Sequence, residues 1–320
     1  MANQKAHAKT NLSAKRGLGL LIFLLFLYVL LPQVKKFHSS LALLKHVNLY
    51  WLGLALLASW LTYFAAGAVY CFLSKKRLNY QKTVLIQVAS NFANKLLPAG
   101  AGAIGTSYNY LRNNGHNKTQ AAVVVAANNM TGIIGHIIIL VTVFSFSRNI
   151  INPFSNMHFH ITSNELIIIL LTAAAIIGGI IVVWLKKARR VLFSFIASIV
   201  GNLKSYRHHP TRLIAALLCA ISMTLLYALT LHASIESVGV NVPFPQVILI
   251  LTFGIAGGTL VPTPGGLGGA EAGLLGGLVA YHVSSGDALV IVLLYRLLTY
   301  WLALATGFIA FFVSGQMGYI

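Results

Sequence analysis

Three charged side chains lie inside apolar stretches of the sequence, and they are the residues best placed to do chemistry there. They are Lys95, Glu271 and Arg296. A charge in an apolar stretch is expensive and therefore usually marks a functional site. Together the three side chains carry one net positive charge, which suits an anion, and a phosphate group fits such a site well. Glu271 is also one of only four acidic residues in the chain.

Counting residues from the ends of the apolar segments places the three charges at a similar depth. At about 1.5 Å per helical residue, each lies roughly 15–16 Å from the nearer membrane face. We therefore expect Glu271 and Arg296 to interact near the midplane, with Lys95 close to them and Asn91 and Asn94 on neighbouring faces of its helix. Two alternatives stay open: the ion pair only ties two helices together, or Lys95 extends its amine toward the membrane surface.

Two runs rich in glycine and proline interrupt the apolar segments that carry these charges. Residues 253–277 include ten glycines among 25 residues. Because proline removes a backbone donor and glycine loosens a helix, each run predicts a break between two short helices. The second helix of each pair would begin at the midplane, where its free N–H groups favour an anion. The breaks contain Pro98 and Gly102 in the first run, and Pro262, Pro264, Gly265 and Gly266 in the second.

The composition is that of a polytopic helical membrane protein. Of 320 residues 58% are hydrophobic and 8% are charged, the mean hydropathy is +0.80, and the net charge is +19. This leaves no room for a soluble catalytic domain or for a basic domain that binds nucleic acid. The one aspartate, Asp287, is expected to cap the last span. Paired acids and metal-ligand spacing are missing, so we expect no enzyme activity, catalytic residue, metal or cofactor. Cys71 and Cys219 fall in apolar spans as packing residues.

The apolar runs predict an all-α integral membrane protein with about six full spans and two re-entrant helical hairpins. The full spans are expected at 18–34, 49–73, 120–146, 164–185, 212–235 and 286–313. The hairpins, at 84–111 and 247–282, would enter from opposite faces, because each half is too short to cross alone. Basic loops at 74–83 and 186–212 place both termini in the cytoplasm.

The order of spans and hairpins predicts an inverted-topology repeat within one transmembrane domain, 1–320. Residues 48–146 form the first repeat and 212–314 the second. An offset of 164 residues aligns Pro98 with Pro262 and Gly102 with Gly266. Residues 147–211 hold a central span and a basic linker, which is either an amphipathic helix on the cytoplasmic leaflet or a plain connection.

The second break and the span after it resemble a known family. The run from Pro262 to Gly268, then Glu271, and then Arg296 within the segment LYRLLTYW, is similar to the flippase-like family that shares the membrane region of lysylphosphatidylglycerol synthase. The first hairpin, from Leu97 to Arg112, resembles that family too. The resemblance implies transfer of a lipid between leaflets. The aminoacyl-transferase domain of the synthase is not expected here, so the chain should not make lysyl-lipid itself.

The sequence departs from the family pattern at two places. Gly105-Thr106 stands where relatives often have Gly-Glu, and the extra arginine that relatives often carry after the first proline does not come before Arg112. Asn128-Asn129 stands where relatives often have an acid–arginine pair.

These observations together predict a protein of the plasma (inner) membrane that translocates an anionic phospholipid or a lipid-linked phosphate. Its partners are membrane lipids, and a homo-oligomer or an enzyme partner stays open. One alternative is a non-transporting scaffold for a lipid- or glycan-modifying enzyme, and another is a secondary transporter of a small anion. The residues expected to bind substrate are Lys95, Glu271, Arg296, Asn91, Asn94, Pro98, Gly102, Pro262, Pro264, Gly265, Gly266 and Arg112.

Overall fold

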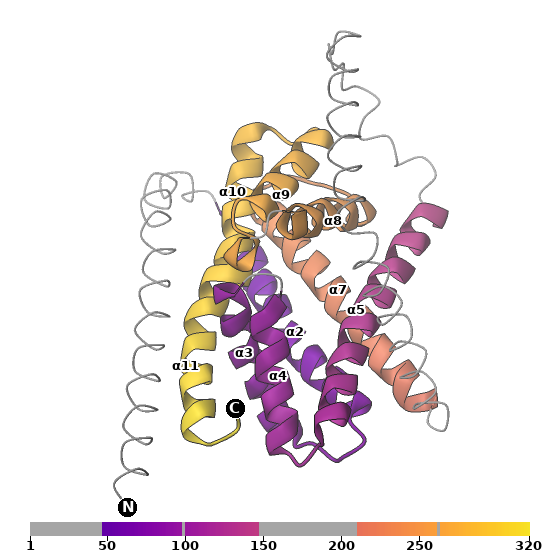
Figure 1. Cartoon of the computed structure of the whole chain (residues 1–320). Coiled ribbons are helices and arrows are strands. Elements are labelled where there is room, and N and C mark those ends of the chain that lie inside the picture. The colour runs from indigo at the N-terminus through magenta and orange to yellow at the C-terminus, as the bar shows by residue number, and fades with distance from the viewer. Residues whose placement is uncertain (1–46, 98–99, 147–209, 261–262) are drawn as a thin grey trace, which may run out of the picture.

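The computed structural model describes residues 47–97, 100–146, 210–260 and 263–320, and in these ranges the chain is helical and has no strand (Figure 1). The helices are α2 (Leu49–Leu73), α3 (Tyr80–Leu96), α4 (Ala101–Asn113), α5 (Lys118–Phe146), α7 (Pro210–Ser237), α8 (Phe244–Leu260), η3 (Pro264–Gly266), α9 (Gly269–Ala280), α10 (Ser285–Arg296), η4 (Leu297–Trp301) and α11 (Leu302–Gln316). The predicted first span, central span and basic linker, and both Pro98 and Pro262, lie outside the described residues.

Four helices are long and apolar enough to cross a membrane. They are α2, α5 and α7, and the continuous rod of α10, η4 and α11 that runs over Ser285–Gln316. Each coincides with one of the predicted full spans, so a multi-pass helical membrane protein is confirmed. The two remaining predicted spans, 18–34 and 164–185, fall in the part that the structure does not describe.

The two predicted hairpins are present as antiparallel pairs of short helices. In the first, Gly102 of α4 lies against the backbone of Ala93 in α3, and a methyl group on Gly102 would come within 2.0 Å of the Ala93 carbonyl oxygen. In the second, Gly273 of α9 meets the backbone of Phe253 in α8 in the same way, at 2.1 Å. Glycine lets the backbones touch, because a side chain would separate them. The re-entrant course of these pairs stays a prediction.

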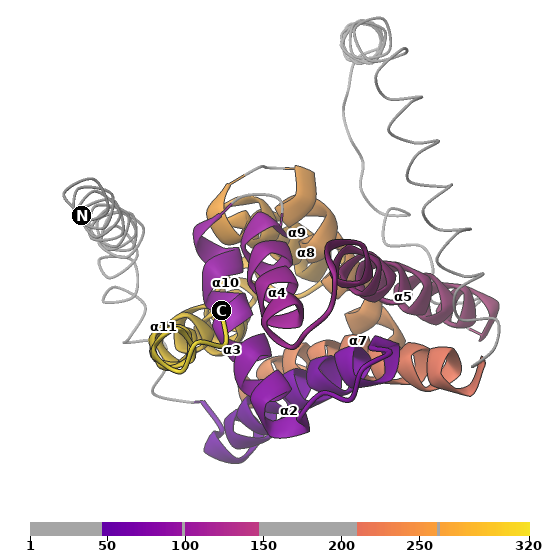
Figure 2. The same ribbon diagram turned by 60° about the horizontal axis from the view of Figure 1, so that its bottom comes forward.

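The two halves of the described chain place their helices in the same order and pack them in corresponding pairs. Within each half the first long helix packs on the hairpin: α2 on α3, and α7 on α8. Between the halves α2 runs against α7 (Figure 2), α3 against α11, and α5 against α8. A pseudo-twofold axis would relate the α3–α11 pair to the α5–α8 pair, and the inverted repeat itself stays a prediction.

The sequence predicted Asp287 as the N-cap of the last span, and this prediction is wrong. The N-cap is Ser284, whose hydroxyl accepts from the Asp287 N–H at 3.2 Å and donates to the Asp287 carboxylate at 2.7 Å. The Asp287 carboxylate therefore lies in the first turn of α10, where its negative charge interacts favourably with the positive end of the helix dipole.

Basic side chains gather at one end of the molecule, around the α2–α3 and α4–α5 loops. Arg212 at the start of α7 donates to the Ser74 carbonyl there at 3.4 Å. The C-terminus lies at this end as well (Figure 1), because Asn113 donates to the Gly318 carbonyl at 3.3 Å and the Lys82 amine lies 4.8 Å from the centroid of the Tyr319 ring.

Candidate functional site

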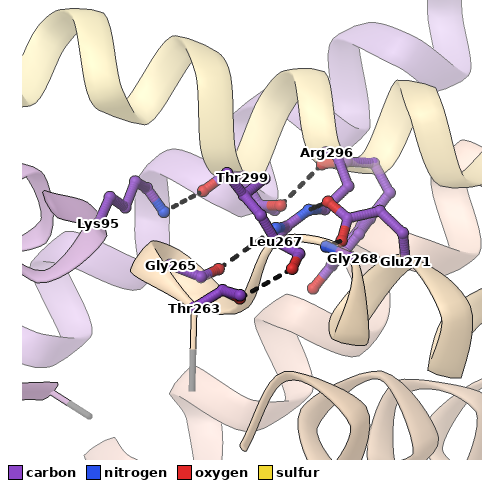
Figure 3. Close-up of polar contacts among 9 residues, drawn as sticks. Lys95, Thr263, Gly265, Leu267, Gly268, Glu271, Arg296 and Thr299 are labelled. Carbon is purple, nitrogen blue, oxygen red and sulfur yellow. Dashed lines mark hydrogen bonds and ion pairs between the residues drawn. The ribbon is translucent and has the colours of Figure 1, made fainter. Parts of the chain in front are cut away.

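Glu271 and Arg296 form an ion pair that joins the second hairpin, at its break, to the last long helix (Figure 3). Arg296 Nε donates to Glu271 Oε1 at 2.6 Å, and Arg296 Nη2 donates to the Gly265 carbonyl at 3.3 Å. The other carboxylate oxygen of Glu271 accepts the Gly268 N–H at 2.7 Å, at the start of α9. The predicted pairing is confirmed, and the pair also holds the 263–268 loop against the last span.

Lys95 lies in the last turn of α3, the first helix of the first hairpin. Its side chain reaches the same region from the other half of the protein. Its side chain is 9% exposed, and its amine donates to the Thr299 carbonyl at 2.9 Å. This carbonyl belongs to η4, a π-helical turn that interrupts the last span. Turns of this kind disturb the regular backbone bonding and often occur at functional sites. Among the described residues no carboxylate lies within ion-pair distance of Lys95, so its charge is matched only by dipoles.

The ring of Tyr300 lies next to both cations. The Lys95 amine is 4.8 Å from the ring centroid and the Arg296 guanidinium carbon is 4.6 Å from it. The backbone of Gly265 lies so close that a methyl group on it would come within 2.4 Å of the ring. Gly265 also has φ +61°, a conformation that only glycine adopts freely, so both its geometry and its neighbour require glycine there.

Apolar side chains close the region where the two hairpin breaks meet. Phe92 and Leu96 of α3 form one buried cluster with Tyr300 and Leu304, and Leu267 of the second break packs against it. A side chain next to the first break thus shares a core with a side chain of the second break. In the described conformation Lys95 is buried beside this contact, whereas the Glu271 side chain remains 30% exposed.

Two other predicted residues lie on the same helix as Lys95. Asn91 donates its amide N–H to the Tyr63 hydroxyl at 2.7 Å. The Asn94 side-chain oxygen is buried and has no hydrogen-bond partner in the described part of the chain. A methyl group on Gly100, the left-handed N-cap of α4, would lie 3.8 Å from this oxygen.

Arg112 is not brought to this cluster. It lies at the far end of α4 from the break, where it donates to the His116 carbonyl at 2.7 Å. Gly102 packs between α3 and α4, Gly266 packs against Gly258, and Pro264 begins the short η3 turn.

Sequence reasoning missed Tyr300 and the Thr299 carbonyl. Tyr300 follows Arg296 by four residues, which places both on one face of a helix, and this spacing could have identified it. A backbone carbonyl that accepts a lysine has no sequence signal, because the π-helical turn that presents it cannot be read from the residue types.

A comparison with known families identifies the family of the chain. The profile of the lysylphosphatidylglycerol synthase transmembrane region matches residues 17–307. The chain belongs to the family of the lysylphosphatidylglycerol synthase transmembrane region. No curated protein matches the chain in a direct search. Membership of the lysylphosphatidylglycerol synthase transmembrane-region family supports a membrane protein connected with lipid modification or transport.

The described residues contain no cluster of three or more histidine, cysteine, aspartate or glutamate side chains that could hold a metal ion.

Proposed function

We propose that this protein moves an anionic phospholipid or a lipid-linked phosphate between the leaflets of the plasma membrane. The observation that carries the proposal is the convergence of Lys95 and Arg296, one from each half, on a site that contains a single carboxylate. The excess charge is one positive, and a phosphodiester headgroup would neutralise it. No chemical step is assigned to the protein.

The two hairpins supply a route for a headgroup through the apolar layer. If they enter from opposite faces, each break marks the end of one half of the path, and the breaks meet beside Lys95. A headgroup could pass along polar groups while its acyl chains stay in lipid, which avoids most of the cost of a charge in hydrocarbon.

The described conformation corresponds to a closed state of such a path. Lys95 is buried, and Leu96 and Leu267 belong to the same apolar cluster. Transport therefore requires that the two breaks separate, which would exchange the Lys95–Thr299 contact for a contact with the headgroup. A substrate can drive this exchange only if it binds the open arrangement better than the closed one.

Leaflet-resolved transport in proteoliposomes tests the proposal. Fluorescent phosphatidylglycerol and phosphatidylcholine are placed in vesicles with purified protein, and the probe in the outer leaflet is bleached chemically. We expect the protein to move the anionic probe at least ten times faster than empty vesicles do. Lys95→Gln should abolish this, Lys95→Arg should retain part of it, and Lys82→Gln, an exposed lysine at the basic end, should behave as wild type. Anionic transport at the wild-type rate by Lys95→Gln would refute the role of Lys95.

A second function, a non-transporting scaffold, is favoured by one observation. Lys95 has partners inside the protein, the Thr299 carbonyl and the Tyr300 ring, and these contacts join the two halves of the chain. A scaffold would show no lipid transport, and Lys95→Gln would lower the melting temperature instead. Free phosphate uptake by the same vesicles would favour the small-anion transporter.

A further inference from the structure

The Tyr300 hydroxyl is a buried polar group without a partner in the described chain. The side chain is 1% exposed, and its oxygen makes no hydrogen bond there. Burying a hydroxyl without a hydrogen bond costs free energy. A phenylalanine would fill the same space without that cost, so the hydroxyl needs a reason other than packing.

Hydrogen-bond donors exceed acceptors among Tyr300 and the two cations that lie beside its ring. The Lys95 ammonium has three N–H groups, of which one reaches the Thr299 carbonyl. Arg296 uses Nε on Glu271 and Nη2 on the Gly265 carbonyl, which leaves Nη1 without a hydrogen bond in the described residues. The Tyr300 O–H is a further donor. A ligand that completes this set must offer several acceptor oxygens and negative charge, as a phosphate does.

Tyr300 is also fixed in position, as a group that orients a ligand must be. The Gly265 backbone lies against its ring, Trp301 packs edge-on with ring centroids 4.9 Å apart, and both cations lie near the ring. A side chain held by so many neighbours is pre-organised, and its hydroxyl can bind a ligand without a further ordering cost.

We propose that Tyr300 is a headgroup-binding residue whose hydroxyl donates a hydrogen bond to a phosphate oxygen held between Lys95 and Arg296. The inference rests on the proposed function in taking the phosphate to be that of a lipid headgroup. The anion reaches the hydroxyl when Leu267 moves away from the cluster of Phe92, Leu96 and Leu304, and the Tyr300 O–H then adds a directional donor to the N–H groups of the two cations. A free phosphate ion has the same chemistry, and the test separates the two sources.

The test is ligand-dependent thermal stability of the purified full chain with Tyr300→Phe. This change removes only the hydroxyl and keeps the ring beside both cations. Without ligand, Tyr300→Phe should melt at or above the wild-type temperature, because an unpartnered hydroxyl is lost. Dihexanoyl phosphatidylglycerol should raise the wild-type melting temperature, and its apparent Kd should weaken at least fivefold in Tyr300→Phe.

Tyr110→Phe is the matched control. Tyr110 is also 1% exposed, but its hydroxyl bonds to Thr83 at 2.9 Å. Its loss should lower the melting temperature and leave the apparent Kd for dihexanoyl phosphatidylglycerol unchanged. Dihexanoyl phosphatidylcholine and inorganic phosphate are run in parallel, and a stronger dependence on Tyr300 for phosphate than for the anionic lipid would assign the site to the free ion.

Two outcomes overturn the inference: an unchanged Kd in Tyr300→Phe, or a wild-type protein that neither phosphatidylglycerol nor phosphate stabilises. Its failure is distinguishable from that of the proposed function. If the wild type transports anionic lipid while Tyr300→Phe binds it normally, only the inference fails. If binding depends on Tyr300 and no lipid moves between leaflets, the site stands and the transport function fails.

Discussion

At Arg296 one side chain serves three partners, and this explains how a charge can be kept where the protein is largely apolar. The guanidinium pairs with Glu271, donates to the Gly265 carbonyl and lies near the Tyr300 ring. Lys95 lacks such a carboxylate. Only Arg296 is paired with the acid, so the stability of the site depends on which of the two cations is removed.

Substitution of Glu271 and Arg296 by glutamine should change the free energy of unfolding in a non-additive way. Glu271→Gln leaves the arginine without its acid and beside Lys95, while Arg296→Gln leaves a carboxylate that is 30% exposed and still bonded to Gly268. Each single change should cost roughly 1–3 kcal/mol, allowing for that exposure, and the double change should cost less than their sum. Unfolding in mixed micelles measures all four proteins. Strictly additive costs would contradict the pairing.

His116, in the loop between α4 and α5, should make stability depend on pH. It is 2% exposed, its Nδ1 donates to the Leu111 carbonyl at 3.0 Å, and its Nε2 lies 2.9 Å from the Ser74 hydroxyl. Burial, and then the charge of nearby Lys76, lower the pKa of His116 below its ordinary value of 6.5. The unfolded chain thus takes up the proton first as the pH falls through 6.5, and the native state loses stability over that window.

The measurement is the melting temperature between pH 7.5 and 5.5. The wild type should lose more stability over this range than His116→Gln, by at most about 1.4 kcal/mol per pH unit for one proton. All other histidines are the same in both proteins, so the difference between the two curves isolates His116. Parallel curves for the two proteins would show that His116 does not take part.

At the scale of helices, the sequence predicts where each helix lies along the chain better than it predicts which side chains meet between helices. The apolar runs located the four long helices, and the glycine–proline breaks located both hairpins, because length and backbone chemistry are local properties. Counting residues from the ends of the apolar segments predicted that Glu271 meets Arg296, because this count also depends only on local helix length. The neighbour of Lys95 could not be predicted, because the Thr299 carbonyl becomes available through the packing of α3 against α11. Arg112 was grouped with the site from the motif alone, and nearly the whole length of α4 (Ala101–Asn113) separates it from the break.

The hairpins should tolerate alanine at some glycines and reject it at others. Gly102→Ala would push a methyl group to 2.0 Å from the Ala93 carbonyl oxygen, whereas Gly105, on the same helix, has nothing within 4 Å. Gly102→Ala should therefore destabilise by about 1–3 kcal/mol or more. Gly105→Ala should be neutral or stabilise by up to about 1 kcal/mol, because alanine favours a helix.

Thermal unfolding of the two variants, with Gly273→Ala and Gly276→Ala as the corresponding pair in α9, decides the matter. A methyl group on Gly273 would come within 2.1 Å of the Phe253 carbonyl oxygen in α8, whereas one on Gly276 would have no neighbour within 4 Å. Equal stability within either pair would mean that the hairpins do not pack as described.

At the scale of the whole molecule, charge is distributed by end. Of the nine lysines and arginines in the described ranges, Lys95 and Arg296 belong to the site and the rest gather at the end that also holds the C-terminus. These are Lys75, Lys76, Arg77, Lys82, Arg112, Lys118 and Arg212. The opposite end, with the α7–α8 and α9–α10 connections, has Glu236 and Asp287 and no basic residue among the described ones. Loops rich in lysine and arginine stay in the cytoplasm, so the basic end should face inward.

Cysteine labelling in intact cells tests this orientation. In a background of Cys71→Ser and Cys219→Ala, Ser285→Cys lies exposed at the end without basic residues, and Thr119→Cys lies exposed at the basic end. A membrane-impermeant maleimide should label position 285 in intact cells and position 119 only after the cells are opened. Both sites are exposed in the folded protein, so a permeant maleimide should label each and serves as the control. Labelling of position 119 from outside would show that the orientation in the membrane is the reverse of the one predicted. The hairpin of α3 and α4 would then enter from the outer face instead of the cytoplasmic face.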